Sequence, residues 1–367
     1  MSHLRSIAVI AVALAGAGAT AIACFGETLG SVLVGSDRAA ATRAGASDAY
    51  DYLAPLEAAP WIDGDGAVAP SLRGKVVVVN FWTYSCINSL RALPYLRAWI
   101  ERYRDSGLVV LGVHAPEFGF EKDTGKVRQA LARLNPGYPT IQDNDYAIWR
   151  RFGNEGWPGF IFIDAAGKLR GYRLGEGEYA ESEQLIRHLL SENGRDVSGL
   201  PLSAAAGYGI EADADWNDLR SPETYLGYEK ARGFRSPGGF VSDGGHRYAA
   251  ASRLAQNTWD LAGFWTVGPE FAALGGAEGA ISIRFHARDA HLVLGSDAGE
   301  QPIPFRVTLD GAAPGADHGA DTDADGRGEI RDDRLYQLVR QSGAVGDRTL
   351  TITFGRPGVR AYVFTFG

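Results

Sequence analysis

Residues 59–193 alternate between apolar runs typical of buried strands and stretches with apolar residues at helical spacing. Residues 75–81 include four consecutive valines, and residues 108–113 form a second apolar run. Between these runs, the period of an α-helix extends from Cys86 to about Arg104. Further strands are predicted at 138–142, 159–164 and 169–174, and further helices at 127–134, 146–152 and 179–190. The alternation predicts an α/β domain whose mixed central sheet has helices on both faces.

The pattern changes after residue 220. Short alternating or apolar segments separated by Gly, Asp and Pro turns predict strands at 280–286, 291–294, 303–309, 348–354 and 360–366. This rhythm predicts an all-β sandwich over residues 221–367, of the jelly-roll or galactose-binding-like kind. Polar, small-residue stretches at 25–58 and 194–220 are interpreted as linkers.

The first 24 residues resemble an export segment. His3 and Arg5 precede a weakly apolar run, residues 7–23, that ends in small residues suited to signal-peptide cleavage. Cys24 follows directly, as in a lipoprotein acceptor site, although Ala21 stands where leucine is usual. An uncleaved membrane anchor is the third interpretation. All three predict an exported protein of the periplasm or cell envelope, where thiol chemistry matters.

Composition excludes several classes of protein. The 367-residue chain has a formal net charge of −8 and no long basic run, which argues against nucleic-acid binding. Cys24 and Cys86 are the only cysteines, so a scaffold of several disulfides and a four-cysteine zinc site are excluded. The sequence predicts neither a cofactor nor a metal site.

Cys86 is the strongest candidate for chemistry. It lies where the predicted strand at 75–81 gives way to a helix. The unpaired N–H groups and positive dipole end of a helix N-terminus stabilise a thiolate, and only the thiolate is nucleophilic. We therefore predict nucleophilic thiol chemistry at Cys86, with an inert buried cysteine as the alternative.

Several segments resemble the exported thioredoxins of the TlpA and DipZ type, namely residues 80–88, 112–118 and 142–149. Residues 222–228 and 362–367 resemble the extra C-terminal domain of DipZ-like proteins. The resemblance implies a thioredoxin-like fold and a redoxin-type oxidoreductase that exchanges disulfides with exported proteins, in cytochrome c biogenesis. It also implies a small-thiol or membrane redox partner, and a cis-proline, Pro158, opposite the thiol. Substrate-positioning roles are expected for Trp157 with Pro158, and for Trp82 and Tyr84 as apolar surface flanking the thiol.

One position departs from this family. Its members have two cysteines separated by two residues, whereas Ser89 stands here in place of the second, resolving cysteine. Ser89 cannot expel a bound substrate, but it can donate a hydrogen bond to the Cys86 thiolate. Cys86 can thus form mixed disulfides, and their release needs an outside thiol. Ser89 is either natural or a replacement introduced to trap a complex.

Two other functions remain open. Thr83 precedes Cys86 by three residues, as in thiol peroxidases, but Val79 stands where those enzymes have proline. The chain could instead be a non-catalytic binding protein that kept the thioredoxin fold.

The remaining candidates each have a structural alternative. Glu117 is either a proton acceptor for Cys86 or a solvated loop carboxylate, and His114 is expected to be a structural histidine. Residues 321–326, with Asp321, Asp323 and Asp325, match the start of a calcium loop or form an acidic turn. Carbohydrate binding by the second domain would use aromatic side chains that could equally be core: Tyr225, Tyr228, Trp259, Phe264 and Trp265.

Overall fold

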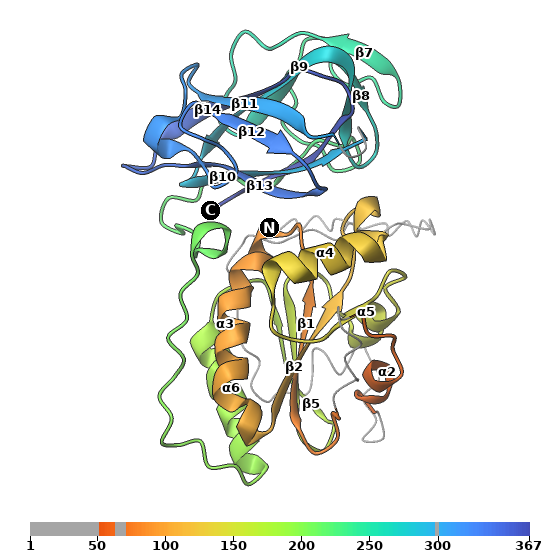
Figure 1. The fold of residues 1–367 in the computed structure, drawn as a ribbon, viewed down its shortest axis with the longest axis vertical. Helices are drawn as coiled ribbons and strands as arrows, with labels where there is room; N and C mark the ends of the chain where they lie inside the picture. Colours follow the sequence, from red (N-terminus) through yellow and green to blue (C-terminus); the bar gives the residue numbers. More distant parts are fainter. Residues whose placement is uncertain (1–50, 63–70, 298–300) are drawn as a thin grey trace, which may run out of the picture.

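The computed structural model describes residues 51–62, 71–297 and 301–367. An α/β domain lies below an all-β domain (Figure 1). The predicted export segment, Cys24 and most of the first predicted linker lie outside the described residues. No helix in the described ranges is long and apolar enough to cross a membrane.

The α/β domain is built on a five-stranded mixed sheet of order β3-β2-β1-β4-β5. Its central strand β1 (Val76–Trp82) is buried at every position. It pairs in parallel with β2 (Leu108–His114) and antiparallel with β4 (Gly159–Ile163). The edge strands are β3 (Thr140–Gln142) and β5 (Leu169–Leu174). The predicted mixed sheet and terminal hairpin are thus confirmed.

Alternate residues of β1 bury against opposite layers, as the two-residue period of a strand requires. Val76, Val78 and Trp82 belong to the hydrophobic cluster that includes α3 (Ile87–Tyr103) and α6 (Tyr179–Glu192). Val77, Val79 and Phe81 belong to the cluster on the other face, with α2 (Ala54–Glu57) and α5 (Ala147–Phe152). Helix α4 (Thr124–Leu134) contributes to the first cluster. Helices therefore cover both faces, as predicted. Short 3₁₀ turns complete the connections: η1 (Arg104–Ser106), η2 (Gly119–Lys122), η3 (Gly209–Glu211) and η4 (Gly315–Asp317).

Both predicted linkers contain packed residues. Leu53 and Leu56, which fall in the first linker, are fully buried against the sheet, so the packed domain begins before residue 59. Residues 194–220 run alongside α3 (Figure 1). Arg97 of α3 forms an ion pair with Glu211 in this segment at 2.7 Å. The segment is therefore held against the α/β domain at this point.

The C-terminal domain is all-β, as predicted, and the pairings between its named strands are antiparallel. Its ten strands form one hydrogen-bonded sheet rather than two separate sheets. The strands are β6 (Thr224–Tyr225), β7 (Gly245–Tyr248), β8 (Thr258–Val267), β9 (Ala272–His286), β10 (Asp289–Ser296), β11 (Ile303–Leu309), β12 (Arg327–Ile330), β13 (Arg334–Arg340), β14 (Asp347–Phe354) and β15 (Val359–Phe366).

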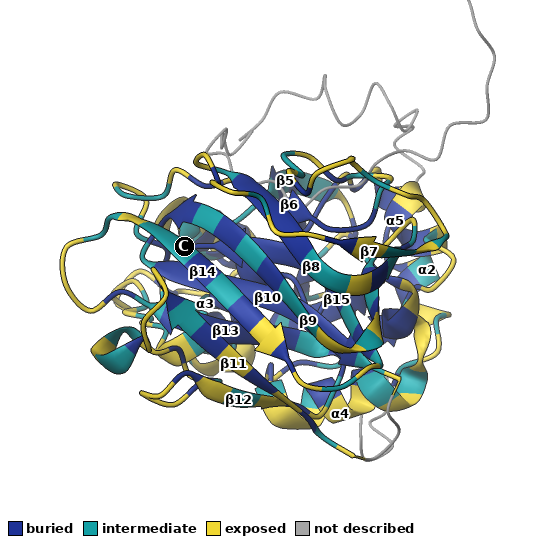
Figure 2. Ribbon diagram, turned by 90° about the horizontal axis from the view of Figure 1, so that it is seen from above, coloured by how far each residue is buried: buried dark blue, intermediate teal, exposed yellow. Residues whose placement is uncertain are grey.

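The main path of this sheet has two halves, β12-β11-β14 and β15-β10-β13, and strand β9 lies between them. Its start pairs with β15, and its later part pairs with β14. Residues of both halves share one buried cluster, in which the Phe305 ring of β11 lies 6.3 Å from the Tyr336 ring of β13. Buried positions run along β8, β9, β10 and β14 (Figure 2). The sandwich is therefore formed by one sheet packing on itself, and its jelly-roll or galactose-binding-like topology stays a prediction.

The two domains share a buried interface. Tyr362 of β15 packs against Phe118 and Phe120, with ring centroids 5.0 and 4.9 Å apart. Arg91 of α3 is buried and reaches the Phe366 carbonyl oxygen at 3.3 Å. The all-β domain thus lies against the loop after β2 and against α3, the helix that begins beside Cys86.

Candidate thiol site

Cys86 is the N-cap residue of α3, with extended backbone angles that let the helix begin at Ile87. The helix is 17 residues long and has no acidic residue in its first turn. Its unpaired N–H groups and dipole therefore favour an anion at this end. The residue is buried, with 2% of its surface exposed.

The thiol lies beside Trp157 and Pro158. Cys86 Sγ is 4.0 Å from the Trp157 carbonyl oxygen, and the Trp157–Pro158 peptide bond is cis. Trp157 belongs to the same hydrophobic cluster as Cys86 and packs on Trp149, with ring centroids 4.8 Å apart. The structure thus brings together three of the residues chosen from the sequence.

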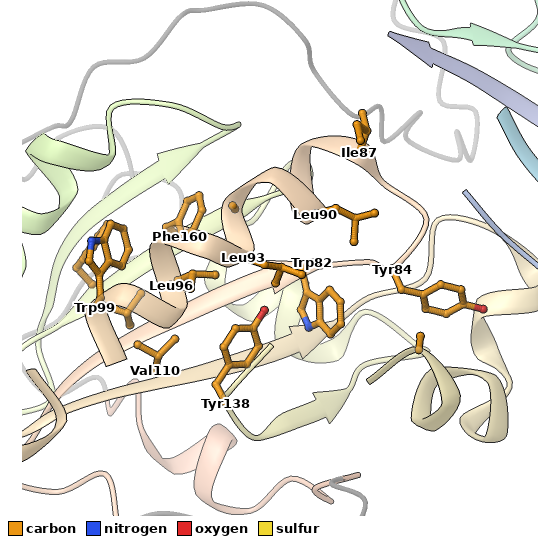
Figure 3. Packing of buried hydrophobic residues seen from close by; sticks show 14 of the residues in the cluster. Trp82, Tyr84, Ile87, Leu90, Leu93, Leu96, Trp99, Val110, Tyr138 and Phe160 are labelled. Carbon is orange, nitrogen blue, oxygen red and sulfur yellow. The ribbon is translucent and has the colours of Figure 1, made fainter. Parts of the chain in front are cut away.

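Trp82 and Tyr84 do not form the predicted apolar surface around the thiol. Both are buried in the α3 cluster (Figure 3), whereas Cys86 belongs to the cluster on the opposite face. Trp82 makes edge contacts with His114 and Tyr138, and Tyr84 stacks on His114 at 5.5 Å. Because strand residues alternate between faces, Trp82 and its partner aromatics belong to the core.

Ser89 lies in the first turn of α3 and is fully buried. Its hydroxyl has no hydrogen-bond partner within the described ranges. The predicted hydrogen bond to Cys86 is therefore not formed here, and its formation with the thiolate stays a proposal.

Glu121 is a functional candidate that sequence reasoning missed. It is fully buried, and its Oε1 atom accepts hydrogen bonds from Thr83 and from Ser85, the latter at 2.6 Å. Its Oε2 atom accepts from the backbone N–H groups of Glu117 and Phe118. One carboxylate therefore holds both the loop before Cys86 and the loop that carries Glu117. Burial raises the pKa of Glu121 to about 7, an effect opposed by the Ser85 and Thr83 hydrogen bonds.

His114 is structural, as expected. It is fully buried, and this desolvation lowers its pKa to about 3, so the ring is neutral. Its Nε2 atom lies 3.3 Å from the Thr83 hydroxyl oxygen. His114 therefore supports the active-site loop from the neighbouring strand β2.

Glu117 is not a solvated carboxylate. Its side chain is 3% exposed, and its Oε1 atom accepts a 2.6 Å hydrogen bond from the Tyr225 hydroxyl. Lys230 Nζ lies 3.9 Å from the same oxygen. Both partners come from the C-terminal domain, so this domain holds the loop that follows β2.

The carboxylates of the candidate calcium loop are paired with arginines instead. Arg334 binds Asp321 at 2.6 Å, and Arg327 contacts Asp325. No group of three or more potential metal ligands occurs among the described residues. The arrangement is that of an acidic turn held by neighbouring cations.

Most aromatic residues considered for sugar binding are not available for stacking. Trp259 and Trp265 are fully buried core residues, which removes the two largest rings. Tyr225 faces the domain interface, and the Tyr228 hydroxyl binds Asp243. Phe264 is the exception at 38% exposure.

Comparison with known proteins agrees with this two-domain arrangement. Residues 55–172 match the AhpC/TSA family, and residues 221–367 match a family described as the thioredoxin-like C-terminal domain. Protein DipZ of Mycobacterium tuberculosis is 39% identical over 225 residues, covering 61% of this chain and 32% of that protein. The chain is similar to DipZ over this stretch. It spans about a third of the length of the DipZ protein it matches.

Further relatives share the thioredoxin-like part. The thiol-disulfide oxidoreductase YkuV of Bacillus subtilis is 27% identical over 132 residues, covering 36% of this chain and 88% of that protein. The thiol:disulfide interchange protein DsbE of Pseudomonas fluorescens biotype C is 30% identical over 118 residues, covering 32% of this chain and 61% of that protein. This part of the chain is thus also similar to thiol-disulfide oxidoreductases.

Proposed function

We propose that this protein is an exported thiol-disulfide exchange protein that uses the single sulfur of Cys86. The observation that carries the proposal is the position of this sulfur, at the start of α3 and 4.0 Å from the Trp157 carbonyl oxygen next to cis-Pro158. The helix end favours the thiolate, and the backbone beside Pro158 offers an edge for an extended substrate segment. The relationship to YkuV and DsbE supports the same chemistry.

The exchange proceeds without net oxidation. The Cys86 thiolate attacks one sulfur of a substrate disulfide, the S–S bond breaks, and the other sulfur leaves as a thiolate. Cys86 is then joined to the substrate in a mixed disulfide. Since Ser89 has no thiol to break this bond, a second substrate thiol or a small thiol attacks it and restores Cys86.

The substrates we propose are exported proteins, with cytochrome c maturation as the setting. The export segment at residues 1–24 supports a location in the periplasm or cell envelope, by cleavage, lipidation at Cys24 or anchoring. Binding without exchange is the alternative that the experiment below separates.

Peroxidase activity is less well supported. A peroxidase would need the Thr83 hydroxyl to be directed at the peroxide beside Cys86. This hydroxyl instead donates to Glu121. The contact favours a role for Thr83 in holding the loop.

The test is the formation of a mixed disulfide with glutathione disulfide, mapped by peptide mass spectrometry. We expect the wild-type chain and Cys24→Ser to gain one glutathione at Cys86, and Cys86→Ser to gain none there. Ser89→Ala serves as a further control and should still form the adduct. An unmodified Cys86 in the folded protein would refute exchange and leave a binding protein as the better account.

A further inference from the structure

A polar pocket lies where helix α4 of the α/β domain meets the all-β domain. Its volume is about 170 Å³, roughly the liquid volume of five to six water molecules. Both domains line it, and the side chains that matter for its chemistry are Tyr84, Lys126 and Arg133 of the first and Arg331, Asp332 and Asp333 of the second. A molecule bound in this pocket would therefore contact both domains at once.

The Tyr84 side chain brings a hydrogen-bond donor to this pocket. Tyr84 is 2% exposed, and its hydroxyl has no hydrogen-bond partner among the described residues. The ring stacks on His114, and the hydroxyl lies on the side away from Trp82 (Figure 3). Burial raises the pKa of Tyr84 above its usual range, so the hydroxyl keeps its proton. Because a buried donor without an acceptor is costly, this hydroxyl favours a ligand that accepts a hydrogen bond.

Both carboxylates that line the pocket already have donors. Asp333 forms an ion pair with Lys126 across the domain boundary and accepts a 3.0 Å hydrogen bond from Arg360. Asp332 accepts a 2.9 Å hydrogen bond from the side chain of Gln129. The charge of Asp333 is thus shared between two cations, and the two acids do not leave the pocket negative.

Arg133 supplies a positive charge that no acid of the protein balances. No carboxylate in the described part of the chain forms an ion pair with it. Desolvation and the nearby charge of Arg334 lower the pKa of Arg133, and the more weakly acting Asp332 opposes them. Arg133 is exposed whereas Tyr84 is buried, so the pocket extends from solvent to the Tyr84 hydroxyl. A water molecule would satisfy that hydroxyl but would leave the guanidinium without a counter-charge.

We propose that this pocket binds a small oxyanion of the size of phosphate, held by Tyr84 and Arg133. The Tyr84 hydroxyl donates to one oxygen of the anion, and the planar guanidinium of Arg133 donates to others. Lys126 adds positive charge from α4, and Arg331 adds it from the all-β domain. The bound anion therefore stabilises the contact between the domains. This binding site is separate from the exchange chemistry of Cys86 and does not depend on it.

The test measures binding of inorganic phosphate to the full chain carrying Cys24→Ser, by isothermal titration calorimetry at constant ionic strength in chloride buffer. We expect saturable binding to this protein. Tyr84→Phe keeps the ring and removes the donor, so the affinity should fall at least ~10-fold, as for a lost hydrogen bond to a charged group. Arg133→Gln removes the unpaired charge and should weaken binding by at least as much. Arg128→Gln is the matched control, since Arg128 is an exposed arginine of the same helix that does not line the pocket.

Urea denaturation gives an independent measurement. In phosphate-free buffer Tyr84→Phe should be at least as stable as the parent protein, because it removes a buried hydroxyl that has no protein partner. Phosphate should raise the urea midpoint of the parent protein and of Arg128→Gln, and raise it less in Tyr84→Phe and Arg133→Gln. If Tyr84→Phe does not fold, the exposed position of Arg133 lets Arg133→Gln decide the question. The proposal is overturned if phosphate does not bind the parent protein, or binds the folded Tyr84→Phe and Arg133→Gln variants as tightly as the parent.

Discussion

The Ser85 hydroxyl donates a 2.6 Å hydrogen bond to the buried carboxylate of Glu121, which lies 36 residues further along the chain. This contact ties the residue immediately before Cys86 to the loop after β2. Two backbone N–H groups of that loop bind the other Glu121 oxygen. Glu121 therefore sets the position of the thiol relative to Glu117 without lining the site itself.

This arrangement predicts how stability depends on pH. Burial raises the pKa values of Glu121 and Glu176 to about 7 in the folded protein, against 4.5 for an ordinary glutamate. Between these pH values the folded state binds more protons than the unfolded state, so stability falls as pH rises. We expect each group to lower the free energy of unfolding by about 2 kcal/mol between about pH 5.5 and 7.5.

Urea denaturation across this range, monitored by tryptophan fluorescence, checks the prediction. Glu121→Gln should remove the contribution of Glu121 to the slope, while the exposed Glu101→Gln should retain it. Gln also places an N–H₂ group against the N–H groups of Glu117 and Phe118, so we expect an overall loss of about 1–3 kcal/mol. If Glu121→Gln kept the wild-type slope of stability against pH, Glu121 would not be a source of this pH dependence.

The second prediction concerns the domain interface. Arg91 is buried, binds Glu176 at 3.2 Å and also reaches the Phe366 carbonyl oxygen. Arg91→Met leaves the buried Glu176 carboxyl without its cation, so that it must take up a proton to stay buried, and we expect the free energy of unfolding to fall by about 1–3 kcal/mol. Urea denaturation at neutral pH provides the measurement.

Two further variants make this test specific. Arg73→Met removes an arginine of exposed ion pairs and should cause little change. Adding Glu176→Gln to Arg91→Met should restore part of the lost stability, because no unpaired buried charge remains. If the double variant lost as much unfolding free energy as the two single variants together, this explanation would be wrong.

The third prediction concerns the missing resolving thiol. Ser89→Cys places a second sulfur in the first turn of α3, where a Cys86 mixed disulfide can be attacked from within the site. We expect this variant to reduce insulin disulfides in the presence of dithiothreitol, with activity clearly above the wild-type background. The turbidity of the precipitating insulin chains reports the rate.

Controls for this gain of activity lie at the same two positions. Ser89→Ala should remain at background, and Cys86→Ser combined with Ser89→Cys should lose the new activity. A folded Ser89→Cys protein that stays inactive would show that the Cys86 site is not arranged for exchange.

Local patterns predicted the α/β domain well. The valine run of β1, the helix after Cys86 and the hairpin of β4 and β5 each depend on neighbours within a few residues. Cys86, Trp157 and Pro158 were all identified from the sequence, because the motifs around them resemble those of a known fold. In the second domain β8 was missed, since Gly263 and a register shift between Gly263 and Trp265 interrupt its alternation.

The sequence did not identify Glu121 or the contact of Tyr225 with Glu117. The contacts that define their roles join segments 36 to 108 residues apart, and no local pattern encodes them. The errors at Trp82 and Tyr84 have a related cause. Their aromatic character was interpreted as substrate surface, whereas strand alternation and the fold direct both side chains into the α3 cluster.

The most direct test of the thiol assignment is the rate at which iodoacetamide modifies Cys86 in the folded Cys24→Ser protein at neutral pH. N-acetylcysteine under identical conditions serves as the reference for an ordinary thiol. We predict faster alkylation of Cys86 than of this reference, with the modification mapped to Cys86 by mass spectrometry. Alkylation that occurs only after the protein is unfolded in urea would contradict the central claim that this sulfur acts as a nucleophile in the folded protein.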